Sequence, residues 1–178
     1  NAYSSIIINS ICNFIKNNRG VIVHTMDGIN SDLLDKKRLF LYLETDTISK
    51  YMRIITEKIT DRNEIRPYII QADKKKFNSV FFDTYANLSS MTKFQPVFAS
   101  VSYDNLQFMV DFESSIADLY KHIKLIRNSN VIEMGIINTY NKSQPTKQKL
   151  VSLTEDLSYV SNTHVKIIER EGSIFIYG

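Results

Sequence analysis

Short, strongly apolar runs alternate along this chain with segments in which apolar residues recur every three or four positions. The apolar runs, which we interpret as buried strands, are residues 21–26, 39–43, 80–82, 97–101 and 131–137. The segments with helical spacing are residues 3–18, 45–59, 113–128 and the stretch containing Leu150, Leu153 and Leu157. A strand that is apolar on both faces is typical of a parallel sheet covered by helices. The alternation therefore predicts an α/β fold with a mainly parallel sheet flanked by helices.

The composition is that of one globular domain covering residues 1–178. The chain is 43% hydrophobic and 23% charged, with a formal net charge of only +3. Because basic and acidic residues are mixed, the overall charge gives no argument for nucleic-acid binding. The single cysteine, Cys12, falls on the apolar stripe of the first helix and is expected in the core. The absence of an apolar run of membrane-spanning length leads us to expect a cytoplasmic protein with no membrane partner.

The segment around residues 76–88 is interpreted as the centre of the fold. Its apolar run stops at Asp83, and the carboxyl end of a buried strand is where open α/β sheets bind ligands. The alternative is that Asp83 only opens a turn. Polar residues also follow the other strands, since Asp27 comes after residues 21–26, and Asn138 and Thr139 come after residues 131–137.

The remaining segments are assigned from local signals. Thr45 and Asp46 are expected to cap the helix over residues 45–59. Residues 66–70 are a weak edge-strand candidate, with Pro67 near the start of the strand. His24 interrupts an apolar strand and is expected to be a hydrogen-bonded interior group. Residues 85–112 are interpreted as a long insertion with an apolar, aromatic part at 94–112. The chain is expected to close with a β-hairpin of strands 164–169 and 173–177.

Three stretches resemble the RecA-like P-loop ATPase core, in particular its archaeal KaiC-like branch. They are Ser79-Val80-Phe81-Phe82-Asp83-Thr84, Ile132-Glu133-Met134-Gly135-Ile136-Ile137-Asn138-Thr139 and Val165-Lys166-Ile167-Ile168-Glu169-Arg170-Glu171-Gly172-Ser173. The resemblance covers most of the chain through short, degenerate motifs. It implies a RecA-like core that ends in a β-hairpin.

The resemblance also implies roles for individual residues. Asp83 would take the Walker B position, where an acid orients the magnesium shell, and Thr139 would lie at the strand tip that senses the γ-phosphate. The residues implied to contact nucleotide are Asp83, Thr84, Asn138 and Thr139. Asp27 would stand where the family has its catalytic glutamate, with a side chain about one methylene shorter.

The phosphate-binding loop of the family does not occur in the sequence. No G-x-x-x-x-G-K-[ST] is present, and none of the five glycines is followed by Lys-Ser or Lys-Thr. The family places this loop just before its first helix, which is where the sequence begins. We therefore expect no cofactor for the chain as given, and ATP with Mg²⁺ if such a loop lies upstream of Asn1.

Three functions are compatible with these features. The first is a catalytically degenerate RecA-like domain that associates with itself or with a RecA-like partner, which it could regulate. The second is an active ATPase whose phosphate-binding loop lies upstream. The third is a nucleic-acid-binding module that uses basic residues, namely Lys74, Lys75, Lys76, Lys121, Lys124, Arg127, Lys142, Lys147 and Lys149. If part of the apolar insertion at 94–112 is exposed, it favours association, because a patch of that size favours burial against another subunit; if the insertion folds back as core, the monomer is self-sufficient.

Overall fold

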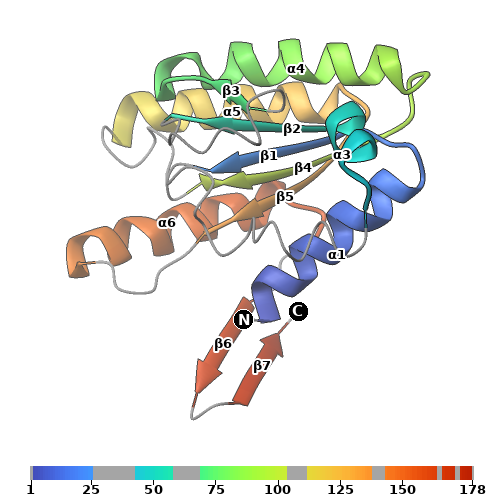
Figure 1. Ribbon diagram of the computed structural model, residues 1–178. Coiled ribbons are helices and arrows are strands. Elements are labelled where there is room, and N and C mark those ends of the chain that lie inside the picture. Colours follow the sequence, from blue (N-terminus) through green and yellow to red (C-terminus); the bar gives the residue numbers. More distant parts are fainter. Residues whose placement is uncertain are drawn as a thin grey trace.

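The computed structural model describes residues 2–25, 43–57, 69–103, 112–137, 143–163, 166–170 and 173–177. Helices and strands alternate along these residues (Figure 1). The elements are α1 (Ala2–Lys16), β1 (Val21–Thr25), α3 (Thr45–Tyr51), β2 (Met52–Thr56), β3 (Ile69–Gln71), η4 (Lys74–Lys76), α4 (Phe77–Met91), β4 (Val97–Ser102), α5 (Phe112–Arg127), β5 (Val131–Ile136), α6 (Gln144–Val160), β6 (Lys166–Arg170) and β7 (Ser173–Tyr177).

Five strands form one sheet in the order β3-β2-β1-β4-β5, and every neighbouring pair is parallel. The central strand β1 pairs with β2 from Val21↔Met52 and with β4 from Val21↔Phe98. The predicted α/β class with a parallel sheet flanked by helices is confirmed. This arrangement is consistent with a RecA-like core.

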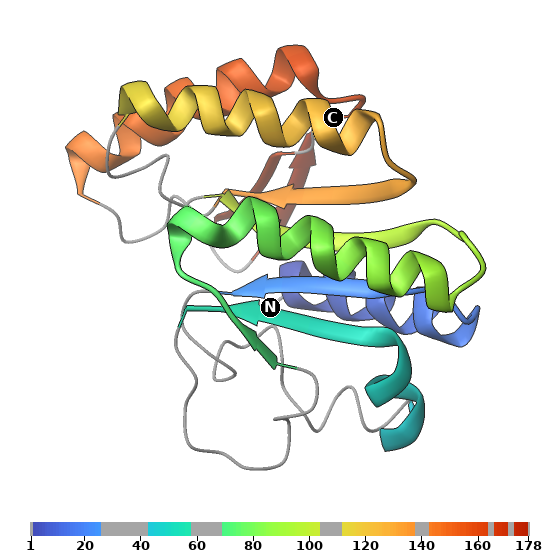
Figure 2. The same ribbon diagram turned by 90° about the horizontal axis from the view of Figure 1, so that it is seen from above.

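The two faces of the sheet pack against different helices. On one face Val21, Val23 and Phe98 pack with apolar residues of α1, and on the other Ile22, Ala99 and Val101 pack with α4 and α5. Figure 1 shows α4 and α5 above the sheet and α1 below it, and Figure 2 looks down on the same sheet from the α4 side. Helix α6 adds Leu150 and Leu153 to the cluster that contains α4 and α5. Burial of alternate strand residues on both faces is what fixes the register.

A short turn joins α1, which ends at Lys16, to β1, which begins at Val21. Asn18 has a positive φ of 57°, a conformation that Asn adopts more readily than most residues. At Gly20 an added Cβ would lie 2.9 Å from the Cβ of Leu88. Glycine at this position therefore allows α4 to approach the start of β1. Cys12 is buried in the α1 cluster, as expected.

The predicted strand at residues 80–82 is wrong, because these residues lie inside α4. The buried residues of this helix include Phe77, Phe81, Thr84 and Leu88, which recur at helical spacing. The three consecutive apolar residues 80–82 concealed this period, since a short apolar run fits a buried helix as well as a buried strand. Val80 and Phe82 are half-buried on the flanks of the stripe.

The predicted helix over residues 45–59 is also wrong in its second half. Helix α3 ends at Tyr51, and the chain continues directly into β2, where Ile54 and Ile55 are buried on opposite faces of the sheet. The β-branched run Ile54-Ile55-Thr56 favours a strand over a helix. Residues 58–59 of the predicted helix and 39–42 of the preceding predicted strand lie outside the described residues.

The predicted strand at residues 97–101 is confirmed as β4, and the interpretation of residues 94–112 as an apolar insertion is corrected at its start. Strand β4 occupies Val97–Ser102, and all of its residues are buried between β1 and β5. The weak edge strand predicted at 66–70 corresponds in part to β3, a three-residue edge strand. Strands β6 and β7 pair antiparallel as a separate two-stranded sheet, and residues 171–172 between them lie outside the described part of the chain.

Candidate functional site

Two of the predicted site residues lie on α4 and not at a strand tip. Asp83 is exposed in the middle of this helix, so its assignment to the carboxyl end of a strand, as a magnesium-orienting acid, is corrected. Thr84 is buried, and its hydroxyl donates a hydrogen bond to the carbonyl oxygen of Val80 at 2.7 Å. Asp27, Asn138 and Thr139 lie outside the described residues.

The described strands show which acids follow buried strands in the sequence. Asp27 comes two positions after the last residue of β1, and Asp104 comes two positions after the last residue of β4. The sequence analysis did not single out Asp104, although it predicted a strand at residues 97–101. Within the described residues, no group of three or more His, Cys, Asp or Glu side chains is arranged to hold a metal ion.

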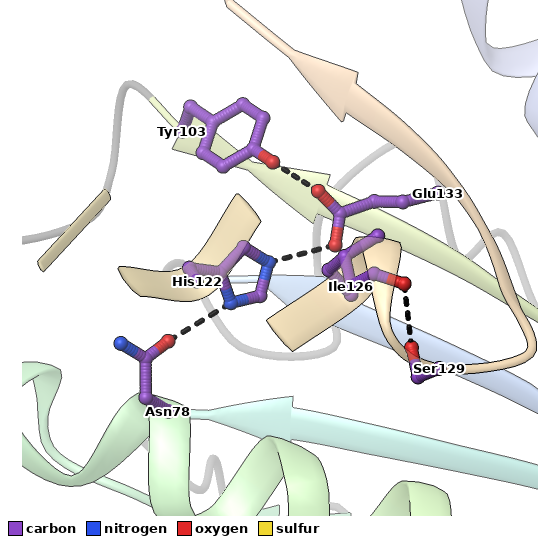
Figure 3. A network of polar contacts seen from close by, with 6 residues as sticks. All are labelled: Asn78, Tyr103, His122, Ile126, Ser129 and Glu133. Carbon is purple, nitrogen blue, oxygen red and sulfur yellow. Dashed lines mark hydrogen bonds and ion pairs between the residues drawn. The ribbon is translucent and has the colours of Figure 1, made fainter. Parts of the chain in front are cut away.

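The structure brings together a buried polar network of Asn78, Tyr103, His122 and Glu133 (Figure 3). His122 on α5 has Nδ1 2.9 Å from Oδ1 of Asn78 on α4, and Nε2 2.7 Å from Oε2 of Glu133 on β5. The phenol of Tyr103, directly after β4, donates a hydrogen bond to the other carboxylate oxygen of Glu133. The network therefore connects four elements on one face of the sheet.

Both ring nitrogens of His122 face acceptor oxygens. Nε2 is paired with the carboxylate of Glu133 and Nδ1 with the amide of Asn78, so both ring nitrogens have a partner. The His122 side chain is 0% exposed and that of Glu133 is 9% exposed. An ion pair this buried is costly to break by removing one partner, because the remaining charge has no water to solvate it.

Tyr103 reaches Glu133 across a glycine. A Cβ added at Gly135 would overlap the ring of Tyr103, so only glycine lets this ring lie flat against β5. Burial raises the pKa of the Tyr103 phenol well above its ordinary value, and the charge of Glu133 and the hydrogen bond to it raise it further. Tyr103 is therefore a neutral donor to Glu133 over the physiological pH range.

Aromatic rings enclose the imidazole of His122. Phe77, Phe81 and Phe82 of α4 have ring centroids 5.7, 5.2 and 5.8 Å from it. His24 of β1 contacts the same cluster, with its ring centroid 4.6 Å from that of Phe77. The helical stripe of α4 thus forms an apolar wall around the imidazoles of two histidines.

His24 is an interior residue, as predicted, but its Nδ1 has no hydrogen-bond partner among the described residues. Burial lowers the pKa of His24 to about 3, and the charge of His122 contributes in the same direction. His24 is consequently neutral at physiological pH. An unpaired polar atom in the interior lowers stability, since the imidazole loses hydration without replacement.

The sequence analysis missed the network, although two local signals for it exist. Glu133 is the one charged residue in the apolar run 131–137, and His122 falls three positions after Leu119 on the apolar stripe of α5. A charged residue within a buried strand and a histidine on a buried helical stripe are candidates for a mutual contact. Because Tyr103 and His122 are buried, the network is suited to holding β5 in place and not to contacting a substrate.

Strand β5 has a second unusual feature, its open edge. We call the unpaired side of Val131–Ile136 the β5 edge, because among the described strands only β4 pairs with β5. Ile132 is 50% exposed, whereas every residue of the neighbouring β4 is buried. The opposite edge of the sheet is the three-residue β3, and natural sheets commonly protect an edge by keeping its strand short. The β5 edge is six residues long, and Figure 2 shows α6 on the side of β5 that faces away from β4.

Comparison with models of protein families, with curated proteins and with solved structures returns no match. In the part of the chain that the structure describes, no helix is long and apolar enough to cross a membrane.

The candidate site consists of the buried polar network and the β5 edge that it supports.

Proposed function

We propose that this chain is a RecA-like α/β domain that acts by associating with another subunit through the β5 edge, and that it does not hydrolyse ATP by itself. The observation that supports association is that, among the described strands, the sheet ends in a six-residue parallel strand with one unpaired side and a half-exposed isoleucine. Such an edge presents a row of backbone N–H and C=O groups to any added strand.

The interior side of β5 favours the same function. Glu133 ties the strand to α5 through His122 and to the end of β4 through Tyr103. A strand that is fixed from behind does not have to be ordered when a partner binds, so less conformational entropy is lost on association. Ile132 adds apolar area to the backbone hydrogen bonds, since burying it removes its exposed surface from water.

The sequence-based argument for association through an exposed apolar insertion at residues 94–112 is corrected by the structure. Val97, Phe98, Val101 and Tyr103 of the predicted apolar insertion are buried, and among residues 94–103 Phe94, at 75% exposure, is the one large exposed hydrophobic residue. The proposal therefore rests on the β5 edge.

Sedimentation velocity at micromolar concentration tests this function with a matched pair of variants. Ile132→Lys places a charge beside the β5 edge, and Val151→Lys makes the same change on α6 at nearly equal exposure, 50% against 52%. We expect the unmodified chain and Val151→Lys to associate, and Ile132→Lys to sediment as a monomer. Monomeric behaviour of the unmodified chain over this range would contradict the proposal, as would equal loss in both variants.

A further inference from the structure

Four chain segments meet at the edge of the sheet where β1, β2, β4 and β5 begin. Both views place them on the side opposite to the arrowheads of these strands (Figures 1 and 2). The side-chain amide of Asn130 donates a hydrogen bond to the carbonyl oxygen of Phe94, and Nη2 of Arg53 lies 3.9 Å from the sulfur of Met91. Since neighbouring strands lie about 4.8 Å apart, the four segments span roughly 15 Å. We call this surface the amino edge and define it as residues 16–20, 49–53, 91–96 and 124–130.

The amino edge carries several basic residues and no acidic one. None of its residues is Asp or Glu, whereas the whole chain has 19 of these beside 22 Lys and Arg. Its basic residues are Lys16, Arg19, Lys50, Arg53, Lys93, Lys124 and Arg127. Only Lys124 and Arg127 belong to the set that the sequence analysis considered for nucleic acid. Because cations near helix ends also offset the helix dipole, charge alone does not identify a ligand for this surface.

Phe94 is the second, independent feature of the amino edge. Its side chain is 75% exposed. Lys93 and Phe94 have positive φ values of 56° and 62°, which are uncommon for bulky residues. The N–H of Phe94 donates a hydrogen bond to the carbonyl oxygen of Ser89 at 2.7 Å, which ends α4 in a pattern that usually has glycine at the position of Lys93. A hydrophobic residue after such a turn commonly packs back on the helix, but here a strained turn holds the aromatic ring largely in water.

An exposed aromatic ring among positive charges suits single-stranded nucleic acid. Bases of any sequence stack on aromatic side chains, while lysine and arginine neutralise the phosphates. The exposed amide side chains of Asn18, Gln95 and Asn128 add groups that hydrogen-bond phosphates and base edges. An acidic protein segment would use the charges but would not need the ring.

From this combination we infer that the amino edge binds single-stranded nucleic acid, with a base stacked on Phe94 and phosphates at Lys93 and Lys124. Both lysines are exposed, whereas the guanidinium of Arg53 donates hydrogen bonds to backbone carbonyl oxygens of its own segment. Binding at this surface does not depend on the proposed association, because no residue of Val131–Ile136 belongs to the amino edge.

Fluorescence anisotropy of a labelled oligothymidylate tests the role of the ring. Phe94→Gly removes the ring and also relieves the positive φ, so the melting temperature is expected to stay the same or to rise. We expect the affinity of this variant to fall by at least about fivefold, the loss of one stacked base. Phe94→Trp keeps a stacking surface and is expected to bind as the unmodified chain does.

Two lysines at opposite ends of α4 provide a matched pair for the charges. Lys93 follows α4 and Lys75 lies in η4, directly before it, and both are exposed. With affinities measured between about 50 and about 200 mM salt, Lys93→Gln should reduce the slope of log affinity against log salt by about 0.7, and Lys75→Gln should leave it unchanged.

Three results would overturn the inference. The first is that the unmodified chain at micromolar concentration does not bind oligothymidylate at the lower salt concentration. The second is that Lys75→Gln weakens binding as much as Lys93→Gln, which would place the contact elsewhere. The third is that Phe94→Gly binds undiminished while polyglutamate displaces the oligonucleotide from the unmodified chain and from Phe94→Gly equally well, which would identify a surface for acidic proteins.

Discussion

His122 and Glu133 form a buried ion pair in which Nε2 lies 2.7 Å from Oε2, although the two residues belong to a helix and to the last strand of the sheet. The pair fixes β5 from the covered face, while the outer edge of the same strand stays unpaired by any described strand. The six-residue strand β5 therefore joins the buried His122–Glu133 pair to the outer edge of the sheet.

Removal of the charge of Glu133 tests the role of this pair in stability. Glu133→Gln keeps the shape of the side chain but leaves His122 without an anion, so we expect the free energy of unfolding to fall by about 3 kcal/mol. Urea denaturation followed by circular dichroism measures this change. The matched control is Glu155→Gln on the exposed face of α6, for which we expect a change within about 0.5 kcal/mol. Equal effects of the two substitutions would show that the buried pair contributes nothing particular.

Introduction of a methyl group at residue 135 tests the packing of Tyr103. Gly135→Ala sets a Cβ where the Tyr103 ring now lies, and we expect a loss of about 1–3 kcal/mol, the usual range for overpacking. In the Tyr103→Leu background the ring is absent, so the added methyl should cost much less. A double-mutant cycle measures the difference, and additive effects of the two substitutions would contradict the proposed contact.

Because His24 is neutral in the folded protein, we expect the free energy of unfolding to fall as the pH is lowered. Its pKa is about 3 in the folded protein against 6.5 ordinarily, so below pH 6.5 the unfolded chain binds a proton that the folded chain does not. This difference contributes a loss of about 1.4 kcal/mol of stability per pH unit as the pH falls through this window. His24→Phe should remove that contribution and flatten the pH dependence of the unfolding free energy between pH 6 and 4. Parallel curves for the two proteins would contradict the buried, neutral imidazole.

Because Asp83 lies in the middle of α4, we do not expect it to act in ATP hydrolysis. Because Asp83 is exposed on a helix, Asp83→Asn should change the free energy of unfolding by less than about 0.5 kcal/mol. We also expect the chain to release phosphate from magnesium ATP no faster than a blank, since no phosphate-binding loop occurs in its sequence. Magnesium-dependent turnover that is abolished by Asp83→Asn would show that this account is wrong.

Helices and strands with a long or clearly bounded hydrophobic pattern were predicted from the sequence, and those with a short or ambiguous pattern were not. The helices α1, α5 and α6 and the strands β1, β4 and β5 were predicted, because each has a sustained period or a bounded apolar run. Helix α4 was missed because Val80, Phe81 and Phe82 are consecutive, and α3 was extended too far because Met52 and Ile55 happen to continue its period. In both cases packing against the sheet decided the conformation over local spacing.

The candidate site was less predictable than the fold. Asn78, Tyr103, His122 and Glu133 lie on four separate elements, and no local pattern specifies which of them meet. The β5 edge depends on the order of strands in the sheet, which the sequence analysis did not specify. Both features become visible only when residues that are distant in the sequence are placed together.

Amide hydrogen exchange of β5 at two protein concentrations tests the central claim most directly. If the outer edge of Val131–Ile136 pairs with another chain, its backbone amides should become more protected as the concentration rises from nanomolar to micromolar, and those of Ile69–Gln71 at the opposite edge should not change. The same experiment on Ile132→Lys should show no dependence on concentration. Protection of β5 that is identical at both concentrations in the unmodified chain would contradict association through this edge.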